Sequence, residues 1–396
     1  MTTESLLFAL LRVAVCGEKL NTETIAACTP EVLEMVYALA KKHDLAHLVA
    51  HALEGQTMPD CEAMKKLRAA KMKAIYRYAR MDLEYERICK TLEDAQIPFI
   101  PLKGSVLRQY YPAPWMRTSG DIDVLVREAD FEQAIKVLEA DGWITKGNVQ
   151  YQNICMYSAS GVLLELHFNI RVKMESADAV MDTVWQNCTQ MPGKQFTHQQ
   201  TNEFFLCHQL AHMAKHVLVG GSGIRSFLDI WLLNKKLTID NEALQKLCRE
   251  SQLDTFYRNV SELTEVWFGQ AVHTQITEKF EQYILAGGVY GTLTNKVLMA
   301  QAQKGGKIKN FLNRMFVPYE EMKLMYPVLK QWKWLLPICQ VVRWCQVLFD
   351  GRMKKAVSEL KINQGYSAVQ VEDAKHFMED IGLHHTKDVE FDNTPI

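Results

Sequence analysis

The stretch LKGSVLRQYYPAPWMRTSGDIDVLV, residues 102–126, predicts a strand that breaks at a glycine and a second strand with two aspartates one residue apart. Side chains alternate across a strand, so Asp121 and Asp123 share one face, and the Ile and Val residues beside them form an apolar face. Two carboxylates on one face repel each other unless a cation lies between them. Mg²⁺, which binds carboxylate and phosphate oxygens, is the cation we expect there.

A second alternating run, VLLELHFNI at residues 162–170, places Glu165 and His167 on one face and its apolar residues on the other. It follows another apolar run and a turn-like SASG, which predicts a hairpin. If this hairpin pairs beside the aspartate strand, Glu165 joins Asp121 and Asp123 in a cluster suited to two-metal phosphoryl chemistry. His167 can then act as a base, as an orienting group or as a donor to the metal ligands.

The turn Lys103-Gly104-Ser105 lies where the first strand passes into a short helix, expected at residues 105–111. Glycine lets a phosphate approach the backbone, and free amides at a helix start, with Ser105 as the cap, attract anions. Lys103 and Arg117 are cationic neighbours suited to phosphate oxygens. The alternative is a simple strand-to-helix turn with solvated basic side chains.

Composition limits the classes of protein to consider. At 396 residues the chain is long for one core, and 45 Lys and Arg against 46 Asp and Glu give no net charge that favours nucleic acid or anionic membranes. Ten cysteines without C-x-x-C spacing predict reduced thiols and a cytoplasmic protein. The N-terminal apolar stretch is interrupted by Arg12, which favours an amphipathic helix over a signal peptide.

The pattern along the chain predicts an α+β protein, with a small mixed β-sheet core between helical regions. Before and after this core, apolar residues recur with helical spacing. We expect five segments: an N-terminal helical region at 1–94, the α+β core at 95–175, a C-terminal helical domain at 176–300, a basic, Trp-containing helical extension at 301–384, and a loose tail at 385–396.

A row of histidines and a basic segment each allow two interpretations. His208, His212 and His216 recur every fourth residue and share one helical face, which can bind a transition metal or line a cleft. Packing against a neighbouring helix is favoured, because no carboxylate accompanies them at metal-site spacing. Residues 304–361 hold twelve Lys or Arg against four Asp or Glu, and a solvated basic face is favoured there over an RNA or membrane contact.

The order of apolar strand, Gly104-Ser105, short helix, Asp121-x-Asp123 and a later strand with Glu165 resembles the nucleotidyltransferase superfamily that includes DNA polymerase beta and the antibiotic nucleotidyltransferases. More narrowly, LKG, YYP, an Arg before DIDVLV, and LELHF are similar to the family described as uncharacterised nucleotidyltransferases of the NTP-transferase 5 type. The likeness extends through LAKKHDLAHLVAHAL and residues 203–233. Fifteen residues separate Ser105 from Asp121, more than the superfamily pattern usually has, so the loop at 112–114 is expected to take up the surplus.

The resemblance implies that Asp121, Asp123 and Glu165 bind Mg²⁺ ions that hold the phosphates of an NTP, with ATP among the possible donors. It also implies that the triphosphate lies against Gly104 and Ser105, with Lys103, Arg117 and His167 as further nucleotide-binding residues. Glu165 would help to deprotonate a hydroxyl acceptor, whose attack on the α-phosphate releases pyrophosphate.

Two other functions stay open. A non-catalytic nucleotide-binding or regulatory protein can retain the same fold and use its long helices. A phosphohydrolase can use the same acidic cluster, but the KGS turn suits a triphosphate donor better. The residues do not define the acceptor or the nucleotide base.

Overall fold

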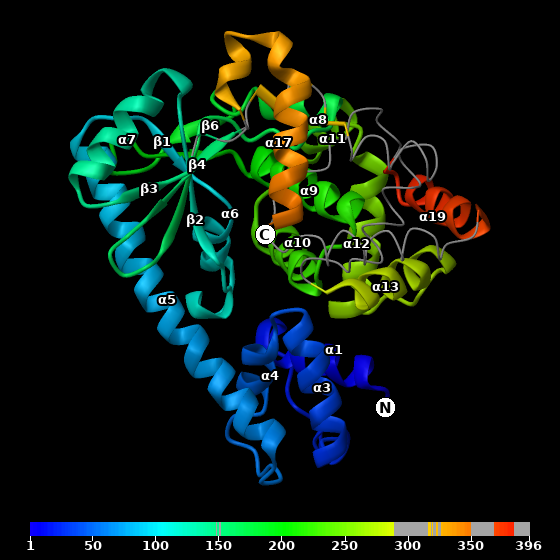
Figure 1. Ribbon diagram of the computed structural model, residues 1–396. Helices are drawn as coiled ribbons and strands as arrows, with labels where there is room; N and C mark the ends of the chain where they lie inside the picture. Colours follow the sequence, from blue (N-terminus) through cyan, green and yellow to red (C-terminus); the bar gives the residue numbers. More distant parts are fainter. Residues whose placement is uncertain are drawn as a thin grey trace.

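A computed structural model describes residues 1–147, 149, 152–288, 316, 317, 319, 322, 323, 326–349 and 368–383. The fold is mixed α+β, with a five-stranded sheet, a two-stranded sheet and helices toward both ends of the chain (Figure 1). The expected fold class is therefore confirmed.

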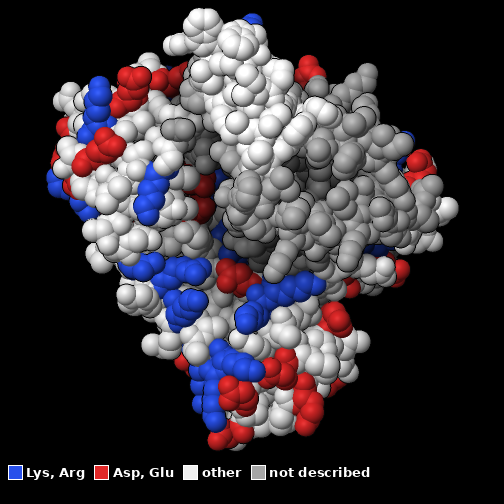
Figure 2. Space-filling model, viewed as in Figure 1, with Lys and Arg blue, Asp and Glu red and all other residues white. Residues whose placement is uncertain are grey.

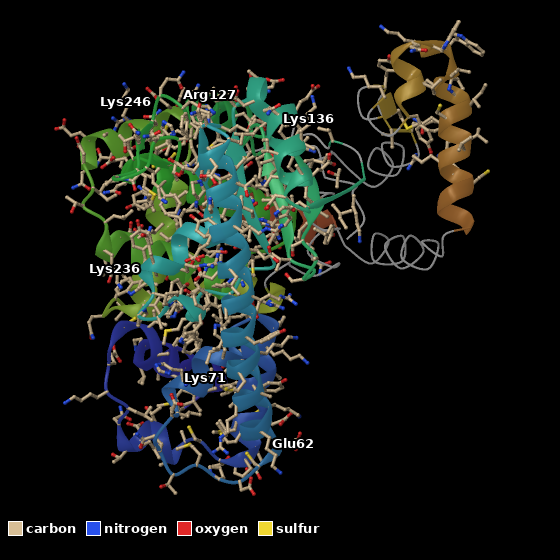
Figure 3. The ribbon with its side chains drawn as sticks, turned by 90° about the vertical axis from the view of Figure 1, so that its left-hand side faces the viewer. Glu62, Lys71, Arg127, Lys136, Lys236 and Lys246 are labelled. Atoms are coloured by element: carbon tan, nitrogen blue, oxygen red, sulfur yellow. The ribbon has the colours of Figure 1, made fainter. Side chains whose placement is uncertain are left out.

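The chain begins with short helices packed against one end of a long one. The elements are α1 (Thr3–Leu11), the π-helix η1 (Arg12–Cys16), α2 (Thr22–Ala26), α3 (Pro30–Lys42), α4 (Ala46–Ala52) and α5 (Glu62–Asp94). Helix α3 starts as its sequence predicts, because Thr29 accepts a hydrogen bond from the Val32 amide and Pro30 occupies the first helical position. Figure 1 shows α5 running from these helices to the sheet, and Figure 3 shows Glu62 and Arg127 near its opposite ends.

The five-stranded sheet has the order β1-β2-β5-β4-β3. Its strands are β1 (Phe99–Pro101), β2 (Asp121–Val126), β3 (Ile144–Lys146), β4 (Asn153–Tyr157) and β5 (Leu163–His167). Strand β2 pairs antiparallel with β1 and parallel with β5, while β4 and β5 form an antiparallel hairpin. Strand β1 lies at the sheet edge, as its proline predicts, and the predicted hairpin lies beside the aspartate strand.

The two faces of this sheet meet different partners. On one face, residues such as Ile122, Val124 and Leu166 form a core with apolar residues of α5 and of α7 (Phe131–Ala140). On the other face, Leu125 joins a larger core that includes residues of the C-terminal helices. Because Asp121 and Asp123 have the same strand parity as Leu125, they face these C-terminal helices.

The rest of the described chain is mostly helical. It contains α8 (Glu175–Met181), strands β6 (Cys188–Gln190) and β7 (His198–Gln200), α9 (Asn202–Val219), α10 (Ile224–Lys236), α11 (Asn241–Glu250), α12 (Asp254–Phe268), α13 (Gln275–Gly287), η5 (Pro327–Lys330), η6 (Lys333–Leu335), α17 (Leu336–Phe349) and α19 (Ala368–Asp380). Helix α17 stands apart from the sheet and N-terminal helices in Figure 3. Much of the basic segment 304–361 and the whole predicted tail 385–396 fall outside the described residues.

The surface carries both signs of charge. On the face drawn in Figure 2, acidic and basic side chains are interspersed over the N-terminal helices and the sheet region. None of the described helices has both the length and the apolar character needed to cross a bilayer.

The loop between α6 (Lys103–Leu107) and β2 is fixed by a buried ion pair. It contains the 3₁₀ helices η2 (Arg108–Tyr110) and η3 (Pro114–Met116), which take up the long spacing before Asp121. Arg117 Nε donates to Asp229 Oδ1 of α10 at 2.7 Å, and the Tyr111 hydroxyl donates to the same oxygen at 2.8 Å. The loop is thereby attached to the C-terminal helices.

The same loop is attached to the N-terminal helices. His47 Nε2 of α4 donates to the Met116 carbonyl at 2.8 Å, and the Thr118 hydroxyl donates to Asp44 Oδ2 at 2.7 Å. Arg225 of α10 joins both sides, since it pairs with Asp44 at 2.6 Å and donates to the Thr118 carbonyl at 3.1 Å. One polar network therefore connects three parts of the chain around the segment that precedes β2.

We expect Asp229→Ala to destabilise the protein by about 3–5 kcal/mol, because it leaves the buried guanidinium of Arg117 without its counter-ion. Denaturant unfolding measures the change. Asp94→Ala is the matched control, because it removes the partner of Lys90 in an exposed pair and should leave the unfolding midpoint almost unchanged. Equal midpoints for Asp229→Ala and Asp94→Ala would show that the network does not hold the fold together.

Candidate active site

Strand register brings two of the three predicted carboxylates together. Asp123 lies directly opposite Glu165, and Leu125 lies opposite His167, in the parallel pair β2–β5. One ligand atom from each of Asp123, Glu165 and His167 lies within 4.8 Å of the others. The predicted proximity of Asp123 and Glu165 is therefore found in the structure. Asp121 lies two residues before Asp123 on the same face of the strand, opposite Leu163. It does not belong to the group of side chains whose ligand atoms lie within 4.8 Å of one another.

Hydrogen bonds link the cluster into one unit. His167 Nε2 donates to Asp123 Oδ1 at 2.9 Å and lies 3.4 Å from Glu165 Oε2. Lys103 Nζ donates to Asp123 Oδ1 at 2.8 Å. Asn153 Nδ2, from the neighbouring strand β4, donates to Glu165 Oε2 at 2.9 Å. Asp123, His167 and Asn153 are all buried, so these bonds are made in a site of low dielectric.

Burial and neighbouring charges give the two aspartates opposite protonation behaviour. For Asp121, burial and the negative charge of Asp123 raise the pKa from its usual value to about 6. For Asp123, burial acts in the same direction, but the positive charge of Lys103 and the hydrogen bond from His167 outweigh it and lower the pKa. Asp123 is therefore ionised at neutral pH, while Asp121 exchanges its proton near pH 6.

The neighbouring carboxylates favour the protonated forms of the two basic groups of the cluster. Burial disfavours the ammonium of Lys103, but the charges of Asp123, Asp121 and Glu165 more than offset this effect and raise the Lys103 pKa. Burial likewise opposes protonation of His167, and its hydrogen bonds to Asp123 and Glu165 raise its pKa overall. The Nδ1 atom of His167 is buried and has no hydrogen-bond partner in the described structure.

The Lys103-Gly104-Ser105 turn differs from the sequence expectation in two ways. Helix α6 begins at Lys103, with Leu102 as its cap residue, so the expected start and side-chain cap at Ser105 are wrong. The Ser105 hydroxyl is buried without a hydrogen-bond partner among the described residues. A Cβ on Gly104 would lie 2.9 Å from the Cβ of Ser119, so packing against the loop already requires glycine here.

Arg117 belongs to a separate group. Its guanidinium pairs with Asp229, and its side chain is only 10% exposed. The prediction that Arg117 binds nucleotide therefore requires a phosphate to compete with Asp229 for this guanidinium.

The histidine face of α9 lies beside the acidic cluster. Burial and the nearby charge of Lys103 lower the pKa of His208 to about 3, and Gln200 hydrogen-bonds its Nδ1 at 3.2 Å. Burial, His216 and Lys103 also lower the pKa of His212. His208 and His212 are therefore neutral side chains close enough to Lys103 to respond to its charge.

Asn153 is the cluster residue that the sequence reasoning missed. It lies opposite His167 in the antiparallel pair β4–β5, and Cys155 lies opposite Glu165. An asparagine with the strand parity of the acidic face was the available signal, since residues two apart in a strand share a face. Its hydrogen bond to Glu165 Oε2 orients that carboxylate together with His167.

We expect Asp121→Asn to stabilise the metal-free protein at pH 8 by about 3 kcal/mol, because the fold holds an ionised Asp121 unfavourably. The folded pKa of about 6 exceeds the unfolded value, so the cost of Asp121 is absent below about pH 4, grows as the pH rises toward 6, and is complete above it. Thermal unfolding in EDTA across this range measures it. A stability difference that is the same at pH 4 and pH 8 would contradict the assignment.

The chain matches the family model described as uncharacterised nucleotidyltransferase over residues 31–269. The match covers more than half of the chain and includes the sheet, the acidic cluster and helices on both sides. A search of curated proteins finds no match. The chain therefore belongs to the family of uncharacterised nucleotidyltransferases.

Proposed function

We propose that this protein is a Mg²⁺-dependent nucleotidyltransferase. It would transfer a nucleoside monophosphate from an NTP, with ATP among the possible donors, to a hydroxyl acceptor and release pyrophosphate. The observation that supports it most directly is the parallel register of β2 and β5, which sets Asp123 against Glu165 on the face that carries Asp121. The family match supports the same class of reaction.

The side chains present suit a hard divalent ion. Asp121, Asp123 and Glu165 supply carboxylate oxygens, which Mg²⁺ prefers, and water and phosphate oxygens commonly complete its shell. We assign these three residues as the metal ligands. When bound, the ions would neutralise the phosphates and stabilise the charge that develops in phosphoryl transfer.

Positioning is the main task of the other residues. We assign Lys103, Gly104 and Ser105 to the triphosphate, because they begin α6 directly beside Asp123. His167 orients Asp123 through the 2.9 Å hydrogen bond. We also assign His167 and Arg117 as nucleotide-binding residues. Holding the donor phosphate and the acceptor in one geometry accounts for a large part of such rate enhancements.

Glu165 is the group we assign to the acceptor proton. The side chain of Glu165 is 25% exposed, whereas that of Asp123 is 4% exposed, so Glu165 is the more accessible of the two. The hydrogen bond from Asn153 leaves one Glu165 oxygen free of that donor. This oxygen would accept the proton of the attacking hydroxyl as the bond to the α-phosphate forms.

A non-catalytic nucleotide-binding or regulatory role is the second candidate. The ammonium of Lys103 against Asp123 is an internal ion pair of the kind that a protein without metal chemistry would retain. Nucleotide binding that is indifferent to removal of Asp121 and Asp123 would favour this role. We also propose a cytoplasmic location, since all ten cysteines are free thiols.

We expect Asp123→Asn to lower pyrophosphate release at least about a hundredfold, because it removes one metal-binding charge from the reacting centre. The assay screens purified protein with each labelled NTP, Mg²⁺ and a panel of hydroxyl acceptors, and detects pyrophosphate. Release of inorganic phosphate instead would indicate a phosphohydrolase.

Glu139→Gln is the matched control. Glu139 is an exposed residue of α7 that accepts a hydrogen bond from the Thr145 hydroxyl, and it lies outside the acidic cluster. It should keep wild-type activity. Wild-type activity in Asp123→Asn would exclude the proposed chemistry, and so would the absence of both nucleotide binding and pyrophosphate release in the wild-type protein.

A further inference from the structure

The ammonium of Lys103 and the imidazole of His167 bind the same oxygen. Lys103 Nζ lies 2.8 Å and His167 Nε2 lies 2.9 Å from Asp123 Oδ1. A carboxylate oxygen has about two lone-pair sites, so these two donors occupy this one. An ion that binds Asp123 Oδ1 must therefore displace one of them.

Lys103 is the donor that can leave. His167 is fixed in a strand with its side chain 2% exposed, whereas the Lys103 side chain is 20% exposed and carries four flexible carbons. A metal ion near Asp123 would also repel the ammonium, and this repulsion is strong because the site is buried. Metal binding and the Lys103–Asp123 contact therefore oppose each other.

The backbone of Lys103 independently indicates that interactions with its surroundings determine its conformation. Its φ angle is +43°, in the left-handed region that residues with a Cβ rarely adopt, and the residue starts α6. Such a conformation persists only where surrounding interactions determine it. The ion pair to Asp123 is the interaction that Lys103 makes from this position.

We propose that Lys103 is a placeholder cation that balances the carboxylates of the metal-free site, competes with a divalent ion for Asp123, and turns to the donor phosphates once the ion is bound. This inference rests on the proposed function and adds an order of events to it. Metal binding would release the lysine, and the released lysine would help to bind the triphosphate.

The test measures Mn²⁺ binding to the full chain without nucleotide, by electron paramagnetic resonance of free Mn²⁺. We expect Lys103→Met and Lys103→Gln to bind Mn²⁺ at least about tenfold more tightly than wild type, because a competing positive charge is gone. Lys103→Arg retains the charge and should show no such gain. Lys90→Met, which removes the lysine of an exposed carboxylate pair, should match the wild type.

Nucleotide affinity supplies the second measurement. With saturating Mn²⁺, Lys103→Met should bind a non-hydrolysable NTP at least about tenfold more weakly than wild type, so the two affinities change in opposite directions. Loss of both affinities would indicate a purely structural lysine and overturn the inference. Unchanged or weaker Mn²⁺ binding in Lys103→Gln, with thermal unfolding as in the wild type, would also overturn it.

These outcomes are separable from those of the proposed function. Tighter Mn²⁺ binding and weaker nucleotide binding in the Lys103 variants, without pyrophosphate release by the wild type, would support the placeholder lysine and reject the transferase. Pyrophosphate release by the wild type, with no gain of Mn²⁺ affinity in either neutral variant, would reject only the placeholder lysine.

Discussion

The parallel pairing of β2 with β5 is the constraint on which the site depends. In this register Asp123 faces Glu165, and the residues between the acidic positions point into the core under α5 and α7. A slip of one residue would turn Glu165 into that core and bring an apolar side chain to the acidic face. Burial of the apolar face therefore fixes the register, and the register places the carboxylates.

Two charged clusters of different character lie near the segment that precedes β2. In the first, Arg117 and Arg225 meet Asp229 and Asp44, so positive and negative groups are balanced within the fold. In the second, three carboxyl groups meet Lys103, His167 and the amide of Asn153. Buried charges are stable when paired, so the first group has the composition of a structural connection. The second contains a group of side chains, Asp123, Glu165 and His167, that could hold a metal ion.

Sequence reasoning succeeded where the local pattern carries the information. Strand alternation assigned Asp123 and Glu165 to one face, and the turn after Tyr157 predicted the hairpin that brings them together. It failed where the partner is remote in sequence. The pairing of Arg117 with Asp229, 112 residues away, and the α6 start at Lys103 depend on tertiary packing. The sequence predicts Gly104 for the approach of a phosphate, yet close packing against Ser119 by itself requires glycine at this position.

The protonation of Asp121 connects the two states of the site. Without a divalent ion, Lys103 and His167 satisfy Asp123, and burial together with the charge of Asp123 raises the pKa of Asp121 to about 6. A bound cation would reverse that balance, since a metal ligand must be deprotonated and metal binding then releases protons. The same low dielectric that makes clustered carboxylates costly would strengthen their attraction for a divalent ion. Lys103 and His167 balance part of the carboxylate charge in this cluster, and a divalent ion would take over that role as the Asp121 proton is released.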